Sequence, residues 1–265
     1  MVERTSGDTA LVARALTRVA DLPQWIDTRG MLLSGRATVI APAGDEGLIV
    51  IVPDLGIASI VGRPAAPRIA EALATLAGDV NVLAQMEDAD HVAHALDGWR
   101  RQRAIIHVLP GVMPWENEAD TNTRVFTRLS APRFTHVPET LRRELLDALK
   151  GRTVSRFVPG TLPRAAVRVS RVTVPMAAVW ADGRPVSFCY PVWQTETRWD
   201  VSIETLAPYR RVGLAARGAR TLIRYMRGAG RTPVWGALET NTASRTLAAR
   251  LGFLEAGGIA VFTAA

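Results

Sequence analysis

The sequence predicts an α/β fold built from two similar units in tandem. Two observations indicate this fold. Apolar runs with strand character alternate along the chain with segments of helical periodicity. The two halves also align with each other, since "GDVNVLAQMED" (78–88) matches "GRTPVWGALET" (230–240) and "AIIHVL" (104–109) matches "GIAVFT" (258–263). An internal duplication explains both observations.

The first unit is expected at 1–112. Its predicted elements are a helix at 8–19, strands at 36–42, 47–53 and 57–62, a helix at 66–78, a strand at 80–86, a helix at 89–99 and a strand at 104–109. Turn formers and acidic residues follow, so we expect a linker at 113–137.

The second unit is expected at 138–265 and repeats this order. Its predicted elements are a helix at 138–151, strands at 175–181, 186–193 and 198–205, a helix at 214–227, a strand at 233–239, a helix at 243–250 and a strand at 257–263. A turn at Asp182 and Gly183 joins the first two strands.

Composition excludes several classes of protein. No stretch among the 265 residues is long and apolar enough to cross a bilayer, so we expect a soluble, cytoplasmic protein without a membrane partner. The one cysteine, Cys189, lies in an apolar run and is expected to be a buried, inert thiol. The net charge of +7 comes with no groove-reading motif, and we expect no nucleic-acid partner.

The turn before the helix at 214–227 has the properties of an anion site. Gly213 and Ala215 have small side chains that let a ligand approach the backbone. The helix start adds unpaired N–H groups and a partial positive charge, and Arg210 and Arg211 flank the turn. The first unit has "IVGRPAA" at this place, with Pro64 in the turn, so only the second unit is expected to bind.

Four further arginines follow one face of the same helix at helical spacing. We interpret them as a solvated helix face, opposite an apolar face that is turned to the core. The four are Arg217, Arg220, Arg224 and Arg227.

The second unit resembles the GCN5-related N-acetyltransferase (GNAT) superfamily. The acetyl-CoA signature of that superfamily, Arg/Gln-x-x-Gly-x-Gly/Ala, is matched by Arg210, Gly213 and Ala215. The downstream Asn-led helix that ends in Gly-Phe is matched by Asn241, Ser244, Gly252 and Phe253. The resemblance covers 176–263. It implies that each unit is a mixed, mostly antiparallel central sheet flanked by helices (α+β), and that the first half is a degenerate copy.

The resemblance also implies acetyl-CoA as cosubstrate. Main-chain N–H groups would hold the pyrophosphate, the two turn arginines would neutralise it, and pantetheine would lie where strand 198–205 diverges from strand 233–239. The implied coenzyme A residues are Ile203, Thr205, Arg210, Arg211, Val212, Gly213, Leu214, Ala215, Ala216, Asn241 and Ser244.

Acetyl transfer to an amine needs a base for the amine and a proton for the departing thiolate. Strand alternation places Asp200 and Glu204 on one face, and the resemblance implies Asp200 as base, with Glu204 second and Glu239 third. Either of the first two could instead pair with nearby arginines. Their role therefore stays open.

The general acid departs from the family pattern. Ala248 stands where many relatives carry a tyrosine, so we favour Ser244, whose alternative role is to cap its helix. Tyr209 and Tyr190 are weaker candidates. Trp193, Trp199 and Trp235 are assigned to the strands that bound the cleft and fit either a core or an acceptor pocket. His91 and His94 stand three apart without further ligands nearby, and we expect no metal.

Two functions remain open. The first is transfer of acetyl from acetyl-CoA, by direct attack, to a primary amine of a small molecule or a peptide N-terminus. The second is a non-catalytic acyl-CoA sensor or scaffold, which Ala248 would permit. The acceptor would be chosen by 194–197, by the helix at 138–151 and by the first unit, whose alternative roles are to form a homodimer or to stabilise the chain.

Overall fold

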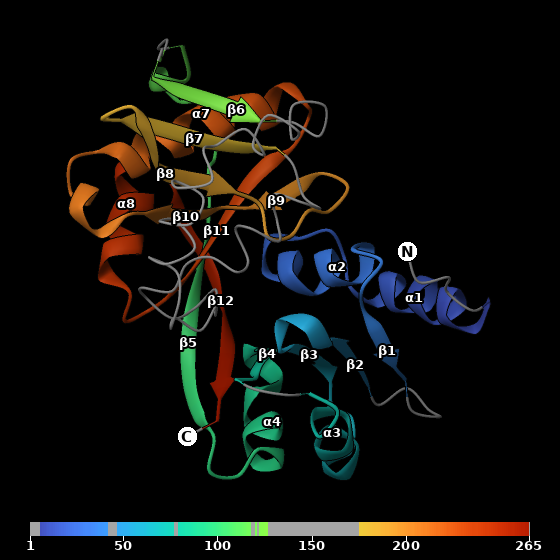
Figure 1. Cartoon of the computed structure of the whole chain (residues 1–265). Helices are drawn as coiled ribbons and strands as arrows, with labels where there is room; N and C mark the ends of the chain where they lie inside the picture. The colour runs from blue at the N-terminus through green and yellow to red at the C-terminus, as the bar shows by residue number, and fades with distance from the viewer. Residues whose placement is uncertain are drawn as a thin grey trace.

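Figure 1 shows the computed structural model of the chain, which describes residues 6–41, 47–76, 79–117, 120, 122–126 and 175–264. The helix expected at 138–151 lies outside these residues, as does most of the expected linker. No helix in the described ranges has the length and apolar character that a membrane crossing would need.

The first half forms nine helices and strands among its described residues. They are α1 (Ser6–Arg18), α2 (Ile26–Leu33), β1 (Thr38–Ile40), β2 (Gly47–Val52), β3 (Ile57–Gly62), α3 (Ala66–Leu73), β4 (Asn81–Gln85), α4 (Ala89–Ala95) and β5 (Arg100–Val108). The sequence analysis missed α2, because its buried residues do not follow a one-sided helical stripe. Helices α3 and α4 are both shorter than predicted. They end at Leu73 and Ala95, whereas the sequence predicted ends at 78 and 99.

The described elements of the second half are β6 (Thr123–Phe126), β7 (Met176–Ala181), β8 (Arg184–Tyr190), β9 (Arg198–Asp200), β10 (Ser202–Thr205), α7 (Leu214–Gly228), β11 (Thr232–Leu238), α8 (Thr242–Arg250) and β12 (Leu254–Thr263). From β7 onward the second half follows the predicted order, but the expected linker at 113–137 contains a strand, β6, that pairs with β7. The predicted turn between β7 and β8 is confirmed, since Asp182 and Gly183 both have positive φ, at 52° and 73°. The single strand expected at 198–205 is divided into β9 and β10.

The strands form two sheets. One has eight strands in the order β1-β2-β3-β4-β12-β5-β11-β9, and the other has four in the order β10-β8-β7-β6. The centre of the large sheet, β4-β12-β5-β11, reads symmetrically, because the last strand of each half lies between the two strands of the other half. The long antiparallel pair of β5 and β12 is visible in Figure 1 at the middle of the molecule. The duplication seen in the sequence therefore produces one shared sheet.

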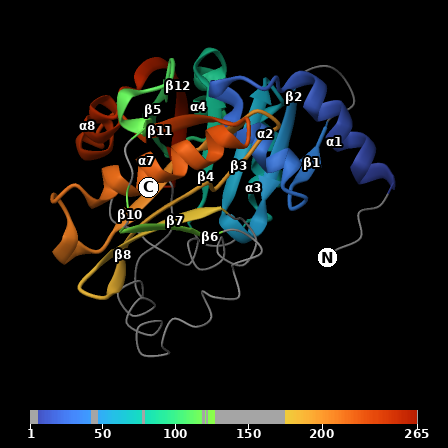
Figure 2. The same cartoon turned by 90° about the horizontal axis from the view of Figure 1, so that it is seen from above.

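Helices cover the sheets according to strand alternation. In β2, Leu48 and Val50 face the core under α1 and α2, whereas Ile49 and Ile51 face the core under α3 and α4. The second half packs α7 against strands of both sheets (Figure 2). Gly218 permits this close approach, since a Cβ there would lie 3.3 Å from Val179 Cγ2.

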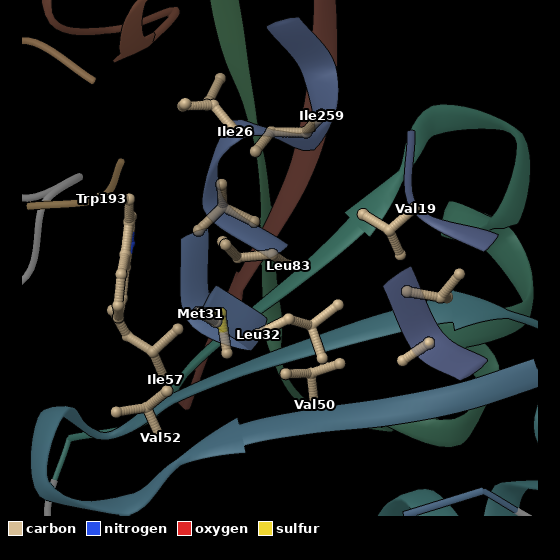
Figure 3. Packing of buried hydrophobic residues seen from close by; sticks show 14 of the residues in the cluster. Val19, Ile26, Met31, Leu32, Val50, Val52, Ile57, Leu83, Trp193 and Ile259 are labelled. Atoms are coloured by element: carbon tan, nitrogen blue, oxygen red, sulfur yellow. The ribbon is translucent and has the colours of Figure 1, made fainter. Parts of the chain in front are cut away.

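One core joins the two halves. It contains Ile26, Met31 and Leu32 of α2 together with Trp193 and Ile259 of the second half (Figure 3). Trp193 lies beyond the end of β8, which corrects its assignment to a strand at the cleft. Burial of these apolar side chains contributes about 1.5–3 kcal/mol each. Because both halves contribute side chains to this core, the first half stabilises the folded second half.

Candidate functional site

The site is built around the place where β10 separates from β11. Strand β9 pairs in parallel with β11 from Arg198 opposite Thr232 to Asp200 opposite Val234. The N–H of Val201 then donates to the carbonyl of Val234 at 2.8 Å. Beyond this bond β10 pairs antiparallel with β8 in the other sheet, while β11 continues beside β5. The two strands thus diverge at Val201, as the sequence predicted for this segment.

Asp200 forms the division between β9 and β10. Its carboxylate accepts hydrogen bonds from the N–H of Trp193 and, at 3.2 Å, from the hydroxyl of Ser202. Its own N–H donates to the carbonyl of Trp193 at 3.1 Å. The side chain is fully buried. The contacts of Asp200 with the backbone of Trp193 and the hydroxyl of Ser202 hold the strand break, and its pairing with arginines stays an alternative.

The face of β10 that points away from α7 carries polar groups. Ile203 packs into the core under α7, so Glu204 points to the opposite face, across from Phe188 in β8. Tyr190 lies across from Ser202 on that same face. Burial raises the pKa of Tyr190 well above its usual value, and the charges of Glu204 and Asp200 raise it further. Tyr190 is therefore a protonated phenol at neutral pH.

Cys189 points to the other face and is buried, as predicted. Burial raises the pKa of its thiol well above the usual value, with a smaller contribution from the charge of Asp200. A thiol in this environment stays protonated and is a poor nucleophile.

The turn before α7 has an unusual backbone conformation. Arg211 has φ of +64° and Gly213 has φ of +87°, both in the left-handed region. Alternation of extended or right-handed with left-handed residues directs successive N–H groups to one side, which is the geometry of an anion-binding nest. No side-chain hydrogen bond from the described residues caps the first turn of α7, and a Cβ built on Gly213 would meet no described atom within 4 Å. The described part of the chain therefore leaves room beside Gly213.

Arg210 ties the turn to the end of β10. Its Nε donates to the carbonyl of Thr205 at 2.9 Å, and the hydroxyl of Thr205 lies 2.8 Å from that of Ser187 in β8. Arg210 and Arg211 are exposed, as is Val212. The turn is therefore fixed at its base and presents two cationic side chains to solvent.

The helix after β11 supplies the second part of the predicted motif. Asn241 caps α8, because its side-chain oxygen accepts the N–H of Ser244 at 3.1 Å. The sequence analysis gave capping of this helix as the alternative role of Ser244. That alternative is wrong, because Asn241 is the residue that caps α8. The hydroxyl of Ser244 instead accepts the indole N–H of Trp235 at 2.9 Å.

The end of α8 explains the Gly-Phe pair. Gly252 has φ of +92° and ends the helix in the left-handed conformation. Phe253 then packs edge-on against Trp235, with ring centroids 5.3 Å apart. Ala248 is buried in the same core, as are Trp199 and Trp235, so these tryptophans are core residues.

The four outer arginines of α7 are not a solvated face. Arg217 lies 3.5 Å from a carboxylate oxygen of Asp120, and Arg220 lies over the ring of Trp115 at 5.5 Å. Arg224 donates to the carbonyl of Glu116 at 3.2 Å. Arg227 is 3.5 Å from the carboxylate of Glu116 and donates to the carbonyl of Gly111. Our interpretation of this stripe was wrong, since it anchors the 111–120 segment on α7.

Three other candidates have ordinary surroundings. Glu239 is about half exposed and lies 3.8 Å from Arg103. Tyr209 donates to a carboxylate oxygen of Asp182 at 3.0 Å, which links the turn to the β7–β8 hairpin. His91 bonds the carbonyl of Pro64 at 2.8 Å, and the described residues contain no group of three His, Cys, Asp or Glu side chains placed for a metal.

The corresponding place in the first half is closed. Strand β3 pairs with β4 without a break, from Ile57 opposite Asn81 to Ile60 opposite Ala84. A Cβ on Gly47 of β2 would lie 2.5 Å from the carbonyl oxygen of Val61 and 2.7 Å from Cδ of Pro64, so β2 packs closely against the turn before α3. The strand divergence of the second half is not repeated there.

Comparison with known proteins agrees with this geometry. Residues 177–260 match the family model described as GNAT acetyltransferase. No curated protein matches the chain.

Solved structures match over almost the whole chain. A GCN5-related N-acetyltransferase-like protein from Streptococcus suis is 14% identical, with a TM-score of 0.65 over 97% of this chain and 99% of its own. A GNAT-family acetyltransferase from Colwellia psychrerythraea is 14% identical, with a TM-score of 0.59 over 99% and 98%. A GCN5-related N-acetyltransferase from Kribbella flavida is 13% identical, with a TM-score of 0.57 over 91% and 93%.

The family match and the fold together support acyl-CoA-dependent acetyl transfer in general. They agree with the resemblance found in the sequence motifs. Residues 177–260 therefore match the GNAT acetyltransferase family model, and the chain has the fold of the GCN5-related N-acetyltransferases.

Proposed function

We propose that the protein is an acetyl-CoA-dependent N-acyltransferase that acetylates a primary amine of a small molecule or a peptide N-terminus by direct attack. The observation that carries the proposal is the coincidence of two features in one half of the molecule. The strand divergence at Val201 lies beside the open turn at Arg211 to Gly213, and the other half lacks the strand divergence.

The residues of the turn fit a pyrophosphate group. Main-chain N–H groups from Arg211 to Ala216 would hold it, because no side-chain hydrogen bond from the described residues caps α7 and the described part of the chain leaves room beside Gly213. Arg210 and Arg211 would neutralise its charge. Ile203 and Thr205 would pair with the pantetheine arm, and Asn241 retains its side-chain NH2 group as a donor. When bound, acetyl-CoA supplies an acetyl thioester that an amine can attack.

We assign Glu204 the role of general base ahead of Asp200. An ammonium group has no lone pair, so the amine must lose a proton before attack. Both oxygens of the buried Asp200 already accept hydrogen bonds, from Trp193 and from Ser202. Glu204 is only partly buried and lies on the face of β10 that turns away from α7. Asp200 then serves chiefly to hold the strand break.

Two residues are candidates for the general acid. Ser244 accepts a hydrogen bond from Trp235, which leaves the proton of its hydroxyl group free to be donated. Tyr190 carries a proton at neutral pH as any phenol does, but burial and the charges of Glu204 and Asp200 raise its pKa and make it the weaker acid. The Ser244→Ala and Tyr190→Phe variants distinguish them, since only loss of the true donor lowers kcat for the acetyl-transfer step in single-turnover measurements at saturating acetyl-CoA.

The test of the proposal is release of free CoA thiol from acetyl-CoA across a panel of primary amines and peptides. We expect turnover with at least one acceptor, and a loss of about 10²–10⁴-fold in Glu204→Gln with a flattened rise of rate with pH. Asp200→Asn should instead lower Tm, because the Trp193 and Ser202 contacts weaken. An unchanged pH profile in Glu204→Gln would remove Glu204 from this role.

A non-catalytic acyl-CoA sensor is the second candidate function. The observation that favours it is that Ala248, at the position of the usual tyrosine, is buried in the core and offers no proton. Tight CoA binding with no thiol release on any acceptor would support the sensor and contradict the enzyme.

A further inference from the structure

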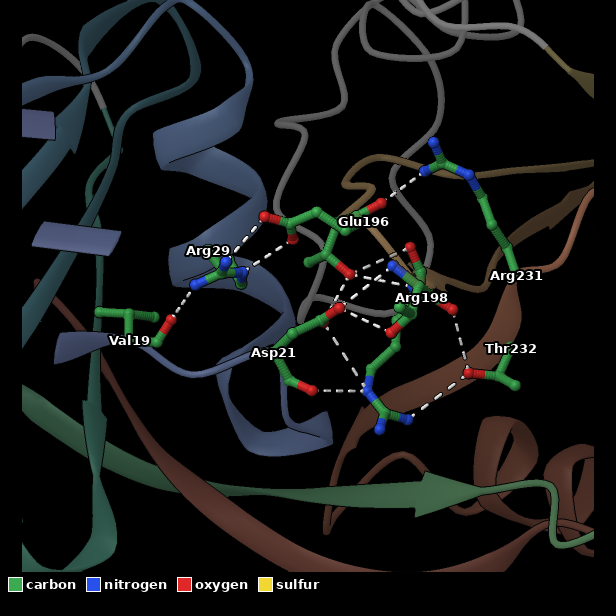
Figure 4. A network of polar contacts seen from close by, with 9 residues as sticks. Val19, Asp21, Arg29, Glu196, Arg198, Arg231 and Thr232 are labelled. Atoms are coloured by element: carbon green, nitrogen blue, oxygen red, sulfur yellow. Dashed lines mark hydrogen bonds and ion pairs between the residues drawn. The ribbon is translucent and has the colours of Figure 1, made fainter. Parts of the chain in front are cut away.

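The first half of the chain contacts the turn that leads into β9. Asp21, between α1 and α2, accepts hydrogen bonds from the hydroxyl of Thr195 at 2.7 Å and from the hydroxyl and N–H of Thr197 at 2.6 and 3.1 Å. The carbonyl of Asp21 accepts the Nε of Arg198 at 3.0 Å. One residue of the first half thus holds three residues of the second (Figure 4).

Arg29 of α2 adds a second attachment. Its guanidinium binds Glu196 in a two-pronged pair, with Nε and Nη2 at 2.8 and 2.7 Å from the two carboxylate oxygens. Its Nη1 donates to the carbonyls of Leu16 and Val19, which fixes the guanidinium against the end of α1 (Figure 4). From the other side, Arg231 donates to the carbonyl of Thr195 at 2.6 Å.

Trp193 is the third attachment, and it reaches the strand break itself. The side chain lies in the core of the first half, against α2 (Figure 3). The contact leaves no room for a side chain on α2, because a Cβ on Gly30 would lie 2.5 Å from Cβ of Trp193. The N–H of Trp193 donates to the carboxylate of Asp200. Helix α2 is therefore connected through one residue to the point where β10 leaves β11.

These contacts are more than a surface ion pair. An isolated exposed pair contributes little, but here the carboxylate of Asp21 receives hydrogen bonds from both backbone and side chains of a four-residue turn. The hydrogen bonds from Thr195 and Thr197 and the charge of Arg198 lower the pKa of Asp21 below its usual value, although burial alone would raise it. The carboxylate is thus ionised at neutral pH and keeps its partners.

We propose that the first half positions the acceptor side of the site. Asp21 and Arg29 are positioning residues that hold the turn at 194–197, and α2 holds Asp200 through Trp193. The inference rests on the proposed function, because it places the amine at the closed end of the divergence, where Trp193 connects this turn to Asp200. It assigns the degenerate copy a role in acceptor binding that the coenzyme turn, on the far side of β10, does not share.

The experiment uses the full chain with Asp21→Asn and Glu196→Gln, and Glu71→Gln as matched control. Glu71 forms an exposed ion pair with Arg68 on α3 at 3.1 Å, remote from the turn. Hydrogen exchange of peptides covering 193–202 should become about tenfold faster in Asp21→Asn and faster by a smaller factor in Glu196→Gln. The exchange rate of these peptides should not change in Glu71→Gln. Peptides from α7 should keep their exchange rate in all three variants.

The kinetic readout uses the amine acceptor found in the thiol-release panel. We expect KM for the amine to rise about tenfold in Asp21→Asn, with the Kd for CoA changed less than about twofold. Unchanged exchange at 193–202 would overturn the proposal, and so would a parallel loss of CoA affinity, which would indicate general destabilisation. If the unmodified protein turns over no amine, the proposed function fails, while the exchange result still decides whether Asp21 holds the turn.

Discussion

The two halves of the molecule share an order of elements but differ where a ligand would enter. In the first half β3 stays hydrogen-bonded to β4, and Gly47 of β2 packs closely against Pro64 in the turn before α3. In the second half the corresponding strand breaks at Val201, and the turn before α7 is open at Gly213. The same topology therefore gives a closed scaffold in one copy and a candidate site in the other.

The difference teaches that a strand break and an open turn make the site, and the sheet alone does not. In the large sheet β12 lies between two strands of the first half, and β5 lies between two strands of the second half. These strand pairs join the two halves whether or not the first half binds a ligand. It contributes the core around Trp193 and the contacts of Asp21 and Arg29. The unit boundaries at 1–112 and 138–265 remain a prediction.

The largest expected effect comes from a charge placed in the open turn. Gly213→Glu puts a carboxylate where the pyrophosphate would lie, and CoA affinity should fall more than about 100-fold by calorimetry. The control is Gly98→Glu in the first half, where φ of +77° and open space match Gly213. Both variants carry the same backbone strain, so both should lose a few degrees of Tm, and only Gly213→Glu should lose binding. Equal CoA affinity in the two variants would contradict the assignment.

A tenfold effect is expected at Arg211. The left-handed backbone of this residue costs about 1 kcal/mol in a non-glycine residue, so Arg211→Gly should leave Tm within about 2 °C of the unmodified protein. Its CoA affinity should fall about tenfold, because one charge-assisted contact is lost. Arg211→Lys is the control and should keep most of the affinity. A Gly variant that binds CoA normally would show that the arginine charge is not used.

The cap of α8 separates stability from binding. Asn241→Ala removes the cap and should cost about 1 kcal/mol and about 2–4 °C of Tm. Asn241→Ser keeps a capping oxygen and should retain Tm, while both variants lose the amide donor proposed for pantetheine and bind CoA more weakly. In the first half, Asp88 stands before α4 without a side-chain cap, so Asp88→Ala should leave CoA affinity unchanged. Normal CoA binding by Asn241→Ser would limit Asn241 to capping.

The smallest effect is a pH dependence at the contact between the halves. The pKa of Asp21 is lowered, because the hydrogen bonds from Thr195 and Thr197 and the charge of Arg198 outweigh burial. The pKa of Glu196 is lowered chiefly by its hydrogen bond from Arg29. A depressed folded pKa means stabilisation that is complete above the unfolded value of about 4 and lost as pH falls through the folded value.

Thermal melts of the unmodified protein and Asp21→Asn should therefore differ at pH 7 and converge as the pH falls through the lowered folded pKa of Asp21. Glu71→Gln serves as the control and should track the unmodified protein across the range. A difference between the unmodified protein and Asp21→Asn that does not shrink over the acid range would mean that the ionised carboxylate does not stabilise the contact.

The sequence predicted what local patterns determine. The duplication, the turn at Asp182 and Gly183, the apolar face of α7 and the family motifs all follow from spacing or composition, and the described elements agree with them.

The remaining features depend on contacts between distant segments. The arginines of α7 meet Glu116 and Asp120, which lie about a hundred positions away in the sequence. The contacts of Asp21 span more than 170 positions. No periodicity encodes such pairings, so the solvated-face interpretation and the strand assignment of Trp193 were wrong.

The most direct test is the stoichiometry of CoA binding to the intact chain by isothermal titration calorimetry. The account predicts one site per chain, which Gly213→Glu abolishes and Gly98→Glu preserves. Two sites per chain, or a single site that survives Gly213→Glu, would contradict the claim that only the second half carries the open turn and the strand divergence that bind coenzyme A.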